Sequence, residues 1–197
     1  MKALLFNSVF HLWNSSKRAA LRRSICYFSL VSSNFISKYD AVDDILQQWS
    51  EERPELDTAP LGVVIRVMAL YRSFYRDANR ALQPLALELW EYDVLSALRR
   101  QGRPFALAAT RLARATDLSG GAMTNRINRL ERRGLVRRRP DKEDRRGVIV
   151  ILSAKGRRVI DEAIRFRLDA ARESVCGLTA NEQEQLAGLL RRIMRLA

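Results

Sequence analysis

Residues 118–152 read LSGGAMTNRINRLERRGLVRRRPDKEDRRGVIVIL, and this stretch decides the fold. Its first part has helical periodicity and stops at Gly134, because glycine commonly follows the last turn of a helix. Short β-prone segments follow at 135–139 and 148–152, and the charged segment 141–147 connects them. A helix followed directly by a strand, a charged turn and a second strand predicts a winged helix-turn-helix.

The predicted helix that begins after Ser119 has two faces of different chemistry. At about 100° per residue, Met123, Ile127 and Leu130 fall on one side and are expected to face the protein. The opposite side is small and polar, and Asn and Arg are the residues that pair with adenine and guanine in a major groove. Ser119 is well placed to cap the helix. The residues of this helix expected to contact DNA are Ser119, Gly121, Thr124, Asn125, Asn128, Arg129 and Arg132.

Positive charge is concentrated on this helix and on the hairpin after it. Ten Lys or Arg residues and four Asp or Glu residues lie between Arg126 and Arg146. Such a concentration is typical of a surface that contacts phosphates. Arg145 and Arg146, at the tip of the hairpin, are expected to contact DNA, since arginine readily enters a narrow minor groove. The plain alternatives are a solvated helix face and a hairpin tip that its charges keep soluble. Because the polar helix face is followed directly by the basic hairpin, we favour groove binding.

The composition of the chain favours a polyanionic partner and gives no sign of an enzyme. The 197 residues carry a formal net charge of +13, so double-stranded DNA is the first candidate. His11 is the single histidine, and Cys26 and Cys176 lie far apart, which leaves no zinc ligand set and no Ser-His-Asp arrangement. We therefore expect no catalytic residue, no metal and no cofactor. Reduced thiols are the default, and a thiol-based sensor lacks an activating partner.

The first 38 residues differ from the remainder of the chain. They hold six basic residues and no acidic one, a composition shared by transit peptides, disordered tails and segments added by a mis-assigned start, of which we favour the last two. No apolar run reaches the roughly 20 residues that span a bilayer, so we expect a cytoplasmic protein that does not engage a membrane.

The remaining chain is predicted to be mainly α, with one domain and an added N-terminal helix. Helices are expected at 40–50, 61–82, 87–101, 107–115, 119–133 and 154–175, and after Thr179. The expected organisation is an extra helix and connector at 39–60 and a main domain at 61–197, with the winged helix-turn-helix at about 87–153 and dimerisation helices at about 61–82 and 154–196.

Three motifs of this chain resemble the core of MarR-family transcription regulators. They are RLERRGLV, which ends the predicted recognition helix, DKEDRRG in the wing, and LSAKGR at the start of the next helix. The similarity covers about Leu61 to Leu196 and implies a homodimer, joined through the first and last helices of the domain, that binds a palindromic site. The apolar faces at 61–75 and 186–194 agree with that use, although by themselves they would equally form an intramolecular core.

A narrower resemblance, to the urate-responsive PecS-type subgroup, is carried by DDILQQWSEERPELD, WEYDVLSALRRQG and GAMTNRINRLE. It implies an extra N-terminal helix and a pocket in which Trp49, Asp93, Arg126 and Arg138 bind a small anionic ligand. Helical spacing separately places Arg126 at the edge of the protein-facing side, where a buried guanidinium needs a carboxylate or an anionic ligand. A structural pair of Asp93 with Arg126, and ordinary packing of Trp49, are the alternatives.

Together these expectations describe a ligand-responsive transcription repressor. It would leave a palindromic operator when an anionic purine such as urate binds. A regulator that responds to a phenolic or antibiotic-like ligand is one alternative, and a non-specific architectural DNA-binding protein is another.

Overall fold

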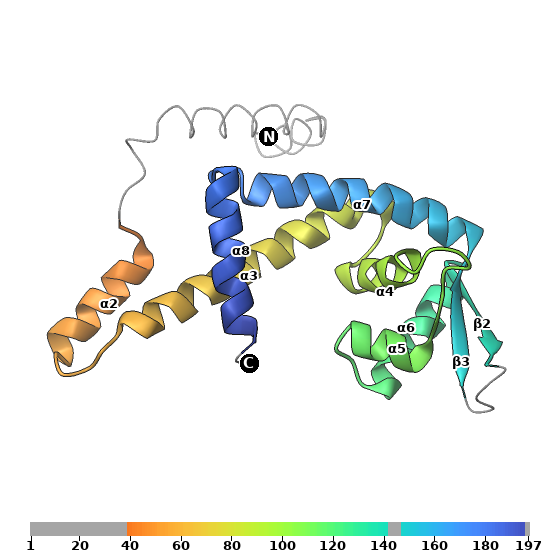
Figure 1. The fold of residues 1–197 in the computed structure, drawn as a ribbon, viewed down its shortest axis with the longest axis horizontal. Coiled ribbons are helices and arrows are strands. Elements are labelled where there is room, and N and C mark those ends of the chain that lie inside the picture. Colours follow the sequence, from red (N-terminus) through yellow and green to blue (C-terminus); the bar gives the residue numbers. More distant parts are fainter. Residues whose placement is uncertain (1–38, 142–146, 196–197) are drawn as a thin grey trace, which may run out of the picture. The chain divides into compact units, whose positions relative to one another are not determined.

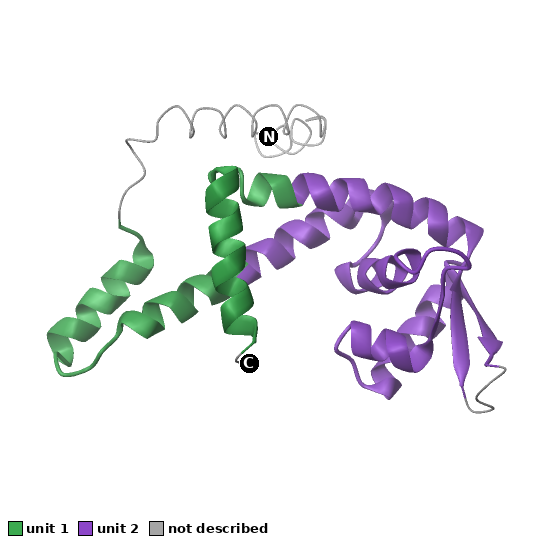
Figure 2. Ribbon diagram, in the orientation of Figure 1, with its two compact units in different colours: residues 1–70, 171–197 green, residues 71–170 purple. Residues whose placement is uncertain are grey.

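The computed structural model describes residues 39–141 and 147–195 (Figure 1). The tail before residue 39, and Arg145 and Arg146 of the wing, lie outside the described residues. The chain divides into two compact units, one formed by residues up to 70 together with those from 171 onward, and one formed by residues 71–170 (Figure 2). Helix is the main secondary structure, as the sequence predicts.

The second unit contains the helix-turn-helix and its sheet. Its elements are the end of α3 (Ala59–Leu82), η2 (Gln83–Leu85), α4 (Leu89–Arg99), β1 (Ala106–Ala108), α5 (Ala109–Ala115), α6 (Gly120–Arg132), β2 (Val136–Pro140), β3 (Val148–Leu152) and most of α7 (Ala154–Ser174). The antiparallel sheet has the order β1-β3-β2, with Leu107 opposite Val150 and Val136 opposite Leu152. The helix-strand-strand order predicted from the sequence is thereby confirmed.

Strand β1 corrects the prediction at the start of the helix-turn-helix. Residues 107 and 108 were expected to be helical and the sheet to have two strands, but Ala106–Ala108 pairs with β3. Phe105 has a φ of 58°, which redirects the chain, and its carbonyl accepts a hydrogen bond of 3.0 Å from the Leu152 amide. A strand of three residues is too short for a periodic signal, so its pairing partner rather than its own sequence determines it.

The hydrophobic core of this unit lies between α4, α5, α6 and the sheet. Met123, Ile127 and Leu130 of α6 are each at most 2% exposed, which confirms the inward face predicted for that helix. They belong to one cluster with buried residues of α4, among them Val94 and Leu98. Burial of these side chains fixes the rotation of α6 about its axis and thereby decides which of its residues face outward.

The first unit contains α2 (Ala41–Glu52), the beginning of α3, the end of α7 and α8 (Ala180–Met194). Asp40 caps α2 in a capping box with Asp43. Arg66 of α3 binds this helix start, because its Nε and Nη2 each lie 2.9 Å from a carboxylate oxygen of Asp40 and Nη2 lies 2.7 Å from Asp43 Oδ1. Leu46 packs closely over Gly62, so the extra helix is attached to the start of α3.

Two further findings concern the chain as a whole. Cys176 is disulfide-bonded in the structure, so the expectation of reduced thiols is wrong for this residue. Over the described residues, none of the helices combines the length and the apolar character that crossing a membrane requires.

Candidate nucleic-acid interface and ligand site

Helix α6 begins with a well-formed N-terminus. The Ser119 hydroxyl accepts a hydrogen bond of 3.3 Å from the Ala122 amide, as the sequence predicts for an N-cap. The Thr124 hydroxyl donates to the Gly120 carbonyl at 2.9 Å. A side-chain carbon built on Gly120 or Gly121 would meet no atom within 4 Å, so the surface in front of this turn is open to a close approach by a partner.

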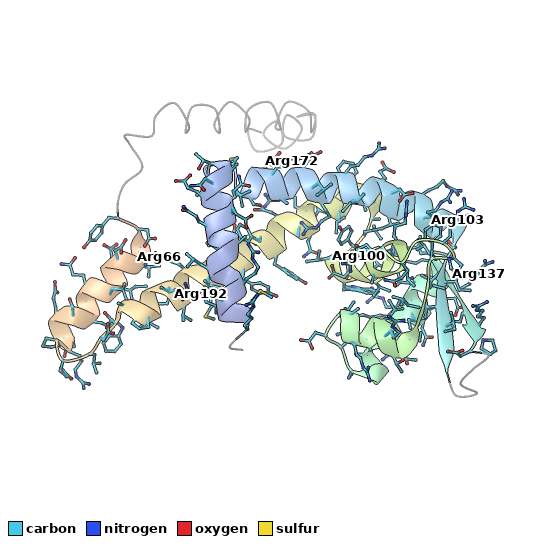
Figure 3. The ribbon with its side chains drawn as sticks, viewed as in Figure 1. Arg66, Arg100, Arg103, Arg137, Arg172 and Arg192 are labelled. Atoms are coloured by element: carbon cyan, nitrogen blue, oxygen red, sulfur yellow. The ribbon has the colours of Figure 1, made fainter. Side chains whose placement is uncertain are left out.

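The outward face of α6 holds the residues predicted to contact DNA. Asn128 is half-buried at the edge of this face, and the other members are exposed: Ser119, Gly121, Thr124, Asn125, Arg129 and Arg132. Beside them, β2 contributes the exposed side chains of Arg137, Arg138 and Arg139, and Figure 3 labels Arg137 on this strand. The structure therefore gathers small, amide and guanidinium groups on the outward face of α6, and β2 adds exposed guanidinium groups next to this helix.

The C-terminal end of α6 is held by contacts that sequence reasoning missed. Arg133 Nη1 lies 2.5 Å from Glu91 Oε2, and its Nη2 donates to the Ala86 carbonyl at 2.9 Å. Glu91 is 1% exposed and also caps α4 by accepting from the Glu88 amide. Lys155 of α7 donates to the Arg133 carbonyl at 2.9 Å. The ion pair between the buried Glu91 carboxylate and Arg133 links the C-terminal end of α6 to α4.

A second group, which we call the Trp90 cluster, consists of Glu88, Trp90, Arg126 and Arg129. The guanidinium carbons of Arg126 and Arg129 lie 5.2 and 4.8 Å from the centre of a Trp90 ring. The Glu88 carboxylate accepts from Trp90 Nε1 at 2.6 Å and from Arg129 Nη2 at 3.1 Å. Arg129 is therefore paired with α4 here and must share or leave Glu88 to contact a base.

The spacing of the two arginines contains the signal for this cluster. Residues three apart lie on the same side of a helix, so Arg126 and Arg129 share one edge of α6. Sequence reasoning assigned the first to the ligand and the second to DNA, and treated them separately. An aromatic residue on α4 that carries both guanidinium groups connects the two predicted sites.

Asp93 has an environment that suits a ligand-binding residue. Burial of its carboxyl group raises the pKa, and the charges of Arg167, Arg126 and Arg100 lower it in part. Part of the side chain remains open to solvent, at the edge of a cavity of about 490 Å³ that Ser96 and Arg100 also line. Figure 3 labels Arg100, the residue directly after α4. Asp93 thus lies within electrostatic reach of Arg126 without an ion pair between them, and a role of the two in ligand binding stays a prediction.

The other two residues predicted to bind the ligand are differently placed. Arg138 binds Glu131 through Nε at 2.9 Å and Nη2 at 2.5 Å, and this hydrogen bonding lowers the pKa of Glu131. Trp49 belongs to α2 in the first unit, and 44% of its surface is exposed there. A role of Arg138 and Trp49 in ligand binding stays a prediction.

Comparisons with known proteins agree with this geometry. The model of the MarR family matches residues 87–147. The transcriptional regulator PecS of Dickeya dadantii is 30% identical over 158 residues, which are 80% of this chain and 95% of that protein. The multiple antibiotic resistance protein MarR of Salmonella typhimurium is 29% identical over 68% of this chain and 91% of its own length.

Solved structures show the same fold. A mutant of MarR from E. coli, crystallised with operator DNA, has a TM-score of 0.61 and 27% identity over 74% of this chain and 96% of that one. AbsC, a MarR family regulator of Streptomyces coelicolor, has a TM-score of 0.66 over 71% of this chain and 95% of its own, and at 23% identity it bears on the fold alone. With the identity to PecS and the exposed face of α6, these likenesses show that the chain belongs to the MarR family of DNA-binding transcriptional regulators and is not an enzyme.

Proposed function

We propose that this chain is a homodimeric repressor that leaves a palindromic operator when a small anionic purine, such as urate, binds beside Asp93 and Arg126. The observation that carries the proposal is the arrangement of α6, because its apolar side is buried and its amide and guanidinium side is exposed. On that surface, Asn128 and Arg129 are the base-reading candidates, and the arginines of β2 supply phosphate contacts.

Dimer formation is supported by apolar side chains that the single chain leaves uncovered. On α3 they include Val63, Val64, Met68, Tyr71 and Tyr75, which are between 48 and 66% exposed. On α8 the exposed apolar residues are Leu186, Leu189, Leu190, Ile193 and Met194. Monomeric proteins rarely leave large apolar patches in water, and a second copy would cover these side chains. Two copies would also present two α6 helices to a palindromic site.

Release by a ligand is supported by the Trp90 cluster. An anion that binds Arg126 withdraws its guanidinium from Trp90, and the same ring holds Arg129. The position of Arg129, and of α6 with it, then depends on whether the ligand is bound. Such a local change of charge partners biases the DNA-binding element between two arrangements. By reciprocity, DNA must weaken ligand binding by the same factor.

A gel-shift titration of the purified chain tests the proposal. The probe is the intergenic DNA next to its own gene, at fixed salt, with and without urate, and unrelated DNA of equal length is the control. We expect specific binding that urate abolishes and that Asn128→Ala weakens. Equal affinity for both DNAs would instead identify an architectural DNA-binding protein. Release by salicylate but not by urate would favour the alternative of a phenolic ligand.

A further inference from the structure

Asp93 lies among three arginines without binding any of them. The charges of Arg167, Arg126 and Arg100 act on its carboxylate, yet Asp93 forms no ion pair within the described part of the chain. Three guanidinium groups around one carboxylate leave an excess of positive charge. The cavity of about 490 Å³ beside Asp93 is also lined by Tyr92, whose ring Arg167 contacts, so a ligand bound there would lie close to groups of opposite charge.

Arg167 of α7 is the least satisfied member of this group. Its guanidinium carbon lies 5.6 Å from the centre of the Tyr92 ring, next to Asp93 in the chain. Its Nε is buried and has no hydrogen-bond partner, and no other buried side-chain nitrogen or oxygen in residues 39–141 and 147–195 lacks one. A buried donor without an acceptor costs free energy, and more so on a charged group.

Arg138, which the subgroup resemblance assigns to the ligand, is already engaged elsewhere. Both its Nε and its Nη2 bind Glu131, and its charge is not among those that act on Asp93. Arg100 is exposed, and its Nε donates to the Ser96 carbonyl of its own helix at 3.3 Å. Of the arginines around Asp93, Arg167 is thus the one with a buried donor that has no acceptor within the described residues.

We infer that Arg167 is a ligand-binding residue, whose Nε donates to an anionic oxygen of the ligand while Asp93 accepts an N–H from the same ring edge. The inference rests on the proposed release by an anionic purine. A ring edge that carries an N–H beside a carbonyl, as cyclic ureides such as urate do, satisfies both side chains at once. This geometry favours ureide anions over simple carboxylates, because a simple carboxylate has no N–H to offer Asp93.

Calorimetric titration of the full chain with urate tests the role of Arg167. We expect Arg167→Met to weaken urate binding at least about tenfold, since a charge-assisted hydrogen bond is lost. Arg165→Met, which removes an exposed arginine from the same helix, should change it less than about twofold. Arg167→Lys keeps the charge but lacks the planar pair of donors, and should still weaken binding at least about fivefold. Unchanged binding by Arg167→Lys would overturn the assignment of the donor.

Operator binding without urate separates misfolding from loss of the site. The variants of Arg167 and Arg165 should bind operator DNA as the wild type does, and Arg167→Lys replaces Arg167→Met if the latter does not. A wild type that binds no urate refutes the proposed ligand, and the inference falls with it. A wild type that binds urate, together with an Arg167→Met variant that binds it equally well, refutes the inference alone. Loss of urate binding by Arg138→Met with normal binding by Arg167→Met would refute it too.

Whether Asp93→Ala weakens or strengthens urate binding tests the proposed hydrogen bond from the ligand to Asp93. A carboxylate that only repels an anionic ligand would, on removal, let that ligand bind more tightly. A carboxylate that accepts an N–H from the ligand would, on removal, leave the ligand bound more weakly. We expect urate to bind Asp93→Ala at least about tenfold more weakly than wild type. Tighter binding would overturn the ring-edge geometry.

Discussion

The Trp90 ring contacts the guanidinium groups of two arginines whose predicted functions differ, and Glu88 forms an ion pair with one of them. The carboxylate of Glu88 lies 3.1 Å from Arg129 Nη2, and both side chains are more than half exposed. An exposed pair of this kind contributes little to stability, roughly 0.2–1 kcal/mol. We expect a larger effect on function, because under the proposed mode of DNA binding Glu88 competes with DNA for the guanidinium and places a negative charge near the phosphates.

Glu88→Gln should therefore strengthen operator binding. The amide still accepts from Trp90 Nε1 but no longer attracts Arg129 as a carboxylate does, so we expect about two- to fivefold tighter binding at low salt. Fluorescence anisotropy with labelled operator DNA measures the change, and Glu162→Gln, on α7, is the control for the loss of one negative charge. Weaker binding by Glu88→Gln would mean that Glu88 positions Arg129 for DNA instead of competing with it.

Arg133 is expected to matter for stability through its buried partner. Arg133→Met leaves Glu91 without its cation. The Arg133 side chain is 38% exposed, so water can partly solvate the carboxylate from that side. We expect the free energy of unfolding to fall by about 2 kcal/mol, somewhat less than for a fully buried pair. Urea denaturation at one protein concentration measures it. Arg132→Met, next to it and outward-facing, should change stability by less than about 0.5 kcal/mol, and an equal loss in both variants would contradict the assignment.

The raised pKa of Asp93 predicts how stability depends on pH. Because burial raises this pKa in the folded state, the unfolded chain releases the proton at lower pH, and stability falls as pH rises from about 3.8 through the folded value. Asp93→Asn lacks this loss, so it should be more stable than wild type at pH 7, with a smaller difference at pH 4. Urea denaturation at both pH values measures it, with Asp44→Asn as control. A less stable variant at pH 7 would show that attraction to the arginines outweighs burial.

At the scale of elements, periodic burial could be predicted from the sequence and contacts between elements could not. Met123, Ile127 and Leu130 repeat at helical spacing, so the buried side of α6 followed from the sequence. Strand β1 and the pair of Glu91 with Arg133 depend on residues more than 40 positions away, and no local pattern reports such partners. Asp93 was predicted from a family resemblance, and Arg126 from that resemblance together with helical spacing. No sequence pattern reports that the Arg167 Nε is buried without a partner, because this depends on the folded structure.

The packing of α7 against the sheet depends on the close approach of the Gly156 backbone to Leu135 and Leu152. A side-chain carbon at this position would lie 2.0 Å from the Leu135 carbonyl oxygen and 3.0 Å from Leu152 Cδ1. Gly156→Ala should therefore force the start of α7 away from the sheet and lower the free energy of unfolding by about 2–3 kcal/mol. Gly188→Ala is the matched control, since nothing lies within 4 Å of its built carbon and alanine favours a helix by up to about 1 kcal/mol. In thermal denaturation, the midpoint temperature should fall for Gly156→Ala and rise for Gly188→Ala.

At the scale of the whole molecule, the proposed function depends on a second copy that covers apolar surface of the first. The apolar stripe of α8 is uncovered in the single chain, and Leu189 in its middle is 55% exposed. Affinity for a palindromic operator requires two α6 helices at a fixed spacing, so loss of the dimer removes half of the contacts. Dimerisation and DNA binding should accordingly fail together, even though no residue of α8 is proposed to contact DNA.

Leu189→Glu tests this dependence, and Arg191→Gln on the other side of α8 changes the net charge by the same amount. Burying two carboxylates in place of two leucines should cost the dimer at least about 3 kcal/mol, a rise of more than about a hundredfold in its dissociation constant. Analytical ultracentrifugation over a concentration series measures that constant, and circular dichroism checks that helix content is retained. Arg191→Gln should sediment as wild type does. A Leu189→Glu chain that remains dimeric and binds its operator normally would place the interface elsewhere than on α8.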